Sequence, residues 1–262
     1  MHRKLALAAG LFIIASGLVW AVPGYHISDD AAAERGVRQY ADDGYKFSAV
    51  VYQALLDKNV WRLALASHRY LQQKPGDPQR ECSFATAYWR SQEIGVTEHV
   101  PPDAKQQLKG LYDEAARDAE DAATKMPGSY QAHTTYAQYL QHFVFGKAKV
   151  ARMFSEYRMA VALRPDLGDA HYHLAMGYAG SGDFSAETAD KAISEFKEAV
   201  ALDPRLKESY FHIAAAYCLP AKHNYKAAQL YFDRYLKVSP AAANAPGVPY
   251  MRKVIQAKVN SQ

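Results

Sequence analysis

Four prolines close similar segments of the chain at nearly regular intervals. They are Pro127, Pro165, Pro204 and Pro240, so the intervals are 38, 39 and 36 residues. A proline cannot continue a helix interior, because it lacks the N–H and its ring clashes with the carbonyl four residues earlier, but it suits the start of the next helix. The regular spacing therefore predicts a series of repeated helical units.

An apolar face precedes each of these prolines. Apolar residues stand there at i, i+4 and i+7, which places them on one side of a helix. They are Ala115, Ala119 and Ala122; Met153, Tyr157 and Ala160; Ala192, Phe196 and Ala199; and Ala228, Phe232 and Tyr235. Each stretch therefore predicts a helix that ends at its proline.

A second pattern opens each unit. A large residue is followed by an alanine and, three residues after the alanine, by another large residue. The four versions are Phe84, Ala85 and Tyr88; Tyr136, Ala137 and Leu140; Leu174, Ala175 and Tyr178; and Ile213, Ala214 and Tyr217. An alanine at this place lets the backbone of a partner helix come close, while the large side chains fill the groove. The sequence thus predicts an all-α chain of packed helix pairs.

These features resemble the tetratricopeptide repeat, a helix–turn–helix unit of about 34 residues with a closing proline. The resemblance covers four units, 76–127, 128–165, 166–204 and 205–240. It implies an α-solenoid of antiparallel helix pairs that coil into a right-handed superhelix. Every unit here is longer than the family repeat, and the tryptophan that is typical of its first helix is absent.

Three segments flank or interrupt these units. Residues 28–75 are interpreted as one degenerate first repeat, with Leu63 and Tyr70 in its second helix, and residues 248–260 as a capping helix. The first clear unit carries an insertion at 91–108. Because insertions in single repeats often carry binding function, this segment is either a binding element or an inert surface loop.

Residues 1–22 have the pattern of a membrane-targeting segment. Arg3 and Lys4 precede an uncharged run of 18 residues, Leu5 to Val22, and such a run spans about 27 Å as a helix, close to the thickness of a bilayer core. The basic start favours an extracytoplasmic, periplasmic or cell-surface location for the rest of the chain. The run is either an uncleaved anchor, favoured by its length, or a signal peptide cleaved near Ala21; a buried N-terminal helix is the third alternative.

The family resemblance also implies a ligand groove along the first helices of the units. Its usual contact positions correspond here to Cys82, Thr86 and Trp89; Thr134, Gln138 and Gln141; Tyr172, Met176 and Ala179; and Phe211, Ala215 and Cys218. The candidate groove residues are Trp89, Gln138, Gln141, Tyr172, Met176 and Phe211. An aromatic face with a few amides suits an apolar peptide or protein segment. The alternative is that Tyr172, Met176 and Phe211 are core residues.

Composition and motifs argue against other classes of function. The chain is 49% hydrophobic and 22% charged, as folded proteins are, and its net charge of +4 is too small and too dispersed for a nucleic-acid surface. No spacing typical of a metal, cofactor or nucleophile site appears. His171 and His173 lie two apart on a helix and face different sides, and Cys82 and Cys218 are expected as separate buried thiols.

The leading hypothesis is therefore a non-catalytic interaction module, an adaptor or assembly factor of a bacterial-type cell envelope. The partner is another protein or peptide, and no nucleic acid, cofactor or metal is expected. A self-associating structural subunit, hence a homo-oligomer, is the alternative from a different class. An enzyme that uses histidine and tyrosine side chains is a minor third hypothesis.

Overall fold

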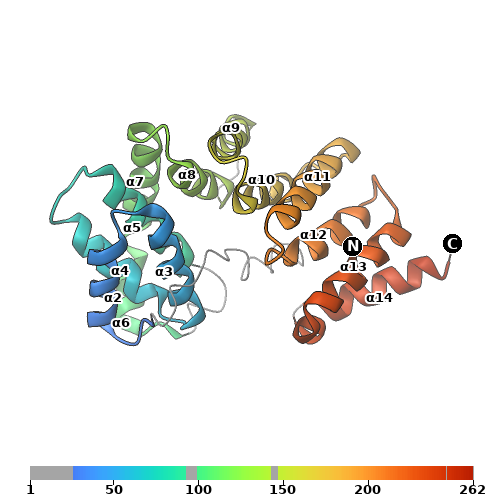
Figure 1. Cartoon of the computed structure of the whole chain (residues 1–262), viewed down its shortest axis with the longest axis horizontal. Coiled ribbons are helices and arrows are strands. Elements are labelled where there is room, and N and C mark those ends of the chain that lie inside the picture. The colour runs from blue at the N-terminus through green and yellow to red at the C-terminus, as the bar shows by residue number, and fades with distance from the viewer. Residues whose placement is uncertain (1–25, 93–98, 143–146, 246, 262) are drawn as a thin grey trace. The chain divides into compact units, whose positions relative to one another are not determined.

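Helices are the only regular secondary structure in the described part of the chain. The computed structural model describes residues 26–92, 99–142, 147–245 and 247–261, so the predicted targeting segment 1–22 lies outside it. Within these ranges there is no β-strand, and the helices form two compact units, with the chain passing from one to the other between Leu163 and Arg164. The N-terminal unit contains α2 to α9 and the C-terminal unit contains α10 to α14 (Figure 1).

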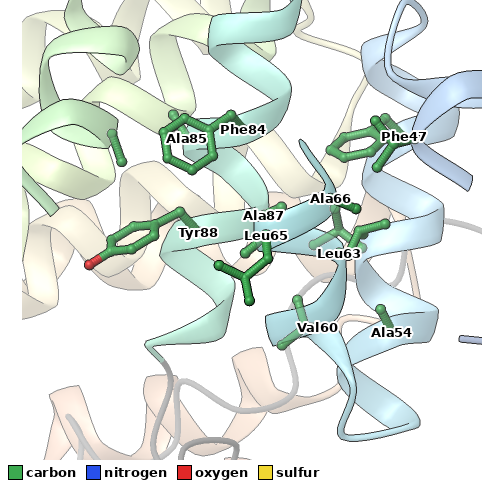
Figure 2. Close-up of a cluster of buried hydrophobic side chains, with 14 of the residues drawn as sticks. Phe47, Ala54, Val60, Leu63, Leu65, Ala66, Phe84, Ala85, Ala87 and Tyr88 are labelled. Atoms are coloured by element: carbon green, nitrogen blue, oxygen red, sulfur yellow. The ribbon is translucent and has the colours of Figure 1, made fainter. Parts of the chain in front are cut away.

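The N-terminal unit ends in two helix pairs. Helix α5 (Pro78–Ser91) packs on α7 (Tyr112–Lys125), and α8 (Tyr130–His142) packs on α9 (Lys147–Leu163). Before them come α2 (Asp30–Tyr40), α3 (Gly44–Leu56) and α4 (Val60–Leu71). Apolar side chains of α3, α4 and α5 converge in one core, as Figure 2 shows for Phe47, Leu63 and Phe84.

Residues 28–75 form three helices, where the sequence predicted a single hairpin. The additional helix begins at Asp43, whose carboxylate accepts a hydrogen bond from the backbone N–H of Lys46 at 3.1 Å. A side-chain cap of this kind satisfies a free N–H of the first turn and starts a helix. The predicted second-helix residue Leu63 is fully buried in α4, as expected, and Tyr70 packs against the same core.

The C-terminal unit also consists of helix pairs. Helix α10 (Gly168–Gly180) packs on α11 (Ala186–Leu202), and α12 (Glu208–Tyr217) packs on α13 (Tyr225–Val238). A 3-10 turn, η3 (Pro240–Asn244), leads to α14 (Val248–Val259), which is the predicted capping helix. The superhelix that the resemblance implies for the whole chain stays a prediction.

The repeated apolar pattern has the structural role that the sequence predicted. All twelve residues of the i, i+4, i+7 faces are buried, and the alanines of the second pattern, Ala85, Ala137, Ala175 and Ala214, are 0% exposed. Each alanine therefore lies where a neighbouring helix covers it, and a larger side chain would separate the two backbones.

The insertion at 91–108 contains a packed helix. Helix α6 (Pro102–Lys109) begins at the second of two prolines, a favourable first position. Val100, Ala104 and Leu108 are buried in the core of the N-terminal unit. The described part of the insertion is thus an element of the fold and not an inert surface loop.

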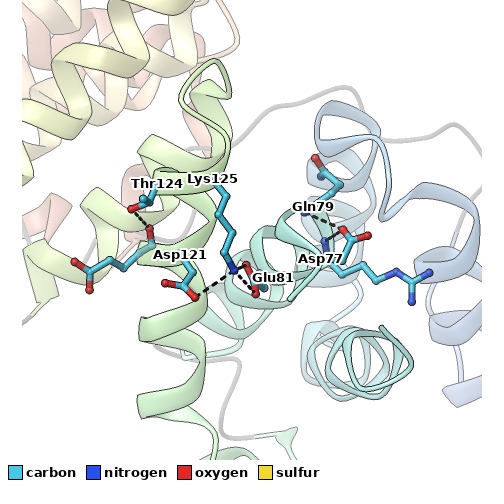
Figure 3. Close-up of polar contacts among 8 residues, drawn as sticks. Asp77, Gln79, Glu81, Asp121, Thr124 and Lys125 are labelled. Atoms are coloured by element: carbon cyan, nitrogen blue, oxygen red, sulfur yellow. Dashed lines mark hydrogen bonds and ion pairs between the residues drawn. The ribbon is translucent and has the colours of Figure 1, made fainter. Parts of the chain in front are cut away.

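In three units, the sixth residue after the preceding proline joins the two helices of the unit. Pro75, at the end of the segment 28–75, precedes the first of these units. After Pro75 this residue is Glu81, a buried carboxylate that accepts hydrogen bonds from Lys125 Nζ at 3.1 and 3.2 Å (Figure 3). After Pro127 it is His133, and after Pro165 it is His171. The contact thus recurs at the same position of the unit, while its chemistry changes from Glu–Lys to His–Glu.

Both histidines face an acceptor at each ring nitrogen. His133 Nδ1 lies 2.5 Å from Glu156 Oε2, and His133 Nε2 lies 3.1 Å from the carbonyl of Pro127. His171 repeats the arrangement with Glu195 at 2.7 Å and with the Pro165 carbonyl at 3.1 Å. Since carboxylates and carbonyls only accept, both ring nitrogens must donate, which makes each ring an imidazolium. The hydrogen-bonded glutamate accordingly raises the pKa of each histidine.

Stability is expected to fall as the pH rises from 6 to 9. A histidine whose pKa is higher in the folded state stabilises fully below its unfolded value, near 6.5, and loses this contribution as the pH rises through the folded pKa. We expect a His133→Gln/His171→Gln variant to lose less stability over this interval than the wild type. Urea midpoints at each pH measure the difference.

Asp118 is the internal control for this experiment. Burial, with help from Glu114 and Glu81, raises the pKa of Asp118 to about 7, so its ionisation also destabilises the fold in this interval. Wild type and variant share Asp118, and their difference therefore reports the histidines alone. Parallel curves for the two proteins would contradict the imidazolium assignment.

Candidate peptide-binding site

The structure places two of the predicted groove residues in the core of the C-terminal unit. Tyr172 is 0% exposed, its ring lies 5.5 Å from that of Phe196, and its hydroxyl lies 3.2 Å from His212 Nε2. Phe211 is 1% exposed and packs against Tyr235. The groove interpretation is therefore wrong for Tyr172 and Phe211, because long side chains at this position reach the neighbouring helix and are covered by it.

The other predicted positions in this unit lie nearer the surface. Met176 is half-buried against the core, Ala215 is half-buried and Ala179 is exposed, whereas Cys218 is buried. The small residues at 179 and 215 thus leave open space where the larger ones are packed.

In the N-terminal unit, the predicted groove residues mainly contact other parts of the fold. Trp89 is half-buried with its ring 5.1 Å from that of Tyr139, Gln138 is buried, and Gln141 accepts a hydrogen bond from the Tyr157 hydroxyl at 2.7 Å. Two further positions, Cys82 and Thr134, are buried. These contacts join α5 to α8 and α8 to α9, and a groove along these helices stays a prediction.

An apolar pocket lies beside these positions in the C-terminal unit, and we name it the alanine pocket. Its volume is about 50 Å³, and it opens between the end of α10, the turn that follows, the start of α11 and the length of α12. It is lined by Tyr178, Ala179, Asp183, Phe184, Thr188, Ala189, Ala192, His212, Ala215, Ala216 and Leu219. Two of these, Ala179 and Ala215, belong to the predicted groove positions.

The wall of the alanine pocket is uncharged apart from Asp183. His212 is buried, and burial lowers its pKa to about 4, so the imidazole is neutral at physiological pH. Phe184 stands at the rim with 44% of its surface exposed. An apolar hollow beside an exposed aromatic ring can gain free energy by excluding water around an inserted apolar group.

One carboxylate marks the edge of the pocket. Asp183 accepts hydrogen bonds from the Thr188 hydroxyl and from the backbone N–H of Ser185, and these lower its pKa. The carboxylate therefore stays ionised and favours a ligand with a cation next to its apolar group.

The sequence reasoning missed this pocket as a site. Ala192 of α11 and Ala214 of α12 were interpreted only as packing residues, and the groove positions Ala179 and Ala215 were not connected with them. The available signal was the coincidence of small residues at 179 and 215 with an aromatic residue, Phe184, just after the turn.

The remaining candidates from the sequence are the possible metal ligands and the two cysteines. No group of three His, Cys, Asp or Glu side chains there is placed to hold a metal ion. Cys82 and Cys218 are buried free thiols, and burial raises their pKa to about 11 and about 12, so neither is a ready nucleophile. No helix in this part of the chain has both the length and the apolar character needed to cross a bilayer.

Comparison with solved structures identifies the fold. TTC0263, a thermophilic TPR protein of Thermus thermophilus, is 16% identical and matches over 88% of this chain and 99% of that chain, with a TM-score of 0.54. The chain has the tetratricopeptide-repeat fold. The comparison thus confirms the fold that was predicted from the repeated prolines and alanines. The sequence itself matches no protein-family model and no curated protein.

Two further structures with this fold are similar. YrrB, described as a TPR protein with an unusual peptide-binding site, is 14% identical over 86% of this chain and 100% of that chain, with a TM-score of 0.50. MamA (residues 41 to the end) from Desulfovibrio magneticus RS-1 is 16% identical over 76% of this chain and 96% of that chain, also at 0.50. At these identities the likeness concerns the fold alone.

Proposed function

We propose that this tetratricopeptide-fold protein is a non-catalytic interaction module that binds a polypeptide through the alanine pocket. The observation that carries the proposal is a mainly apolar hollow between α10, α11 and α12, with an exposed aromatic ring, Phe184, at its rim. The similarity to YrrB, which has a peptide-binding site, supports a peptide as the ligand.

The size of the pocket selects the ligand. A cavity of about 50 Å³ has room for one small branched side chain and not for a whole peptide segment. We infer that a valine or leucine of the partner inserts between Ala179 and Ala215 while its flanking residues lie on the rim. A lysine next to the inserted residue would face the ionised Asp183.

Filling the pocket is expected to abolish binding. The probes are peptides that are identical except for a central alanine, valine or leucine flanked by lysines. We expect the wild type to prefer valine and leucine over alanine by about tenfold or more, because they bury two and three more carbon atoms, each worth about 0.8 kcal/mol. Ala215→Leu removes this preference, as calorimetric titration with each peptide would measure.

Two variants control for indirect effects. Ala179→Leu fills the same pocket from an exposed position, and Ala257→Leu adds the same side chain on an exposed face of α14, away from the pocket. We expect Ala179→Leu to lose binding and Ala257→Leu to retain it. Equal affinity of the wild type for the three peptides, or unchanged binding by both pocket variants, would contradict the proposal.

We further propose that the module works in the cell envelope as an adaptor or assembly factor. The support is the basic start and the uncharged run Leu5 to Val22, which suit an anchor or a signal peptide. Cell fractionation and the N-terminal sequence of the mature protein test this assignment, and recovery of an intact Met1 form in the cytosol would contradict it.

A further inference from the structure

A second cavity lies in the N-terminal unit, beside the helix that the insertion forms. Its volume is about 290 Å³, and it lies between the end of α5, helix α6 and the start of α7. We name it the α6 cavity. It is lined by Tyr88, Gln92, Val100, Lys105, Leu108, Lys109 and Tyr112.

The floor of the α6 cavity is apolar and held in place. Tyr88, Val100 and Leu108 are buried, and the Tyr88 hydroxyl donates a hydrogen bond to the Leu108 carbonyl at 3.1 Å. The rings of Tyr88 and Tyr112 lie 6.3 Å apart. Burial raises the pKa of both phenols to about 12, so the floor is uncharged and suits the apolar body of a ligand.

The mouth of the cavity carries two cations. Lys105 and Lys109 are both exposed and stand at i and i+4, on one face of α6. No ion pair among the described residues involves Lys105 or Lys109. Two like charges at this spacing repel each other, and an anion bound between them would relieve the repulsion.

A nearby carboxylate, Asp113, favours an anion with a single negative charge. Asp113 lies close enough to Tyr88 and Tyr112 to contribute to the raised pKa of both. A second negative charge on the ligand would be repelled by this carboxylate. We propose that the α6 cavity binds a carboxylate on an apolar body, with the apolar part on Tyr88 and Leu108 and the carboxylate between Lys105 and Lys109.

The volume sets the size of the ligand. About 290 Å³ exceeds the roughly 150 Å³ of a cavity that holds a benzene molecule, enough for an aromatic or branched body with a short acid chain. Two sources supply this chemistry, a free carboxylic acid or the carboxyl terminus of a polypeptide that ends in an apolar residue. The proposal is independent of the alanine pocket, which belongs to the other unit.

Titration calorimetry on the full chain tests the proposal with two matched pairs of probes. One pair is 4-phenylbutyrate and its neutral amide, and the other is Gly-Gly-Phe with a free carboxyl terminus and the same tripeptide amidated. We expect at least one acid to bind about tenfold more tightly than its amide, as two exposed charge pairs provide, and the preference to shrink at high salt. Binding of phenylbutyrate alone identifies a free acid, and binding of the tripeptide alone identifies a chain terminus.

Charge variants complete the test. Lys105→Gln/Lys109→Gln is expected to lose the preference for the acid, and Lys253→Gln/Lys258→Gln, which removes two exposed lysines from α14, is expected to keep it. Absence of binding by either acid, equal affinity for acid and amide, or equal loss in both double variants would overturn the proposal. None of these results bears on peptide binding at the alanine pocket, so the two proposals fail separately.

Discussion

Phe196→Ala is expected to destabilise the C-terminal unit by about 3–5 kcal/mol, the range for removing a large aromatic side chain from a packed core. Phe196 is 0% exposed on α11, its ring stacks on His212 of α12 at 5.0 Å, and it meets Tyr172 of α10 at 5.5 Å. Its loss would leave a cavity where three helices meet. Urea denaturation measures the loss in the free energy of unfolding. Hydrogen exchange of peptides from α10, α11 and α12 shows whether the loss lies in these three helices.

The matched control for this substitution is Phe184→Ala. Phe184 belongs to the same unit but is 44% exposed at the rim of the alanine pocket, so its removal should change stability by less than about 1 kcal/mol. We expect it to weaken peptide binding instead. Equal destabilisation by the two substitutions would mean that α11 does not bury the face that the repeat pattern assigns to it.

The sequence was sufficient to predict those parts of the fold that depend on local repetition. The closing prolines fix where helices end, and the alanines at 85, 137, 175 and 214 fix where backbones approach, because both effects act through a few neighbouring residues. All four alanines are fully buried in the structure. The helix expected over 248–260 is present as α14 (Val248–Val259), whose buried Val248, Met251 and Ile255 lie on one face.

Features that depend on contacts between distant parts of the sequence could not be predicted from local patterns. Tyr172 has the spacing of a groove residue, yet its side chain is buried. Its hydroxyl contacts His212, which lies forty residues later in the sequence. The alanine pocket exists because residues at 179, 184 and 215 from three segments are brought together. The prediction of a single hairpin over 28–75 was wrong for a local reason. Asp43 caps the start of α3, and this cap adds a helix that the prediction did not include.

Gly168→Ala is expected to destabilise the C-terminal unit by about 1–3 kcal/mol, the cost of overpacking a close contact. A Cβ at this position would lie 2.6 Å from the carbonyl oxygen of Ala199 and 3.1 Å from a methyl group of Leu206. That carbonyl accepts the hydrogen bond from the N–H of Asp203 that closes α11, so it cannot move without breaking the helix end. Helix propensity alone predicts the opposite sign, because alanine favours a helix over glycine.

Gly128→Ala is the control that separates the two effects. Gly128 also follows a closing proline, but an added Cβ there would meet no atom within 4 Å. Since alanine reduces the entropy of the unfolded chain, we expect this substitution to be neutral or to stabilise by up to about 1 kcal/mol. Urea midpoints of the two variants measure the contrast. A stabilising Gly168→Ala would show that α10 and α11 are not in close backbone contact, and the repeat would then owe its packing to side chains alone.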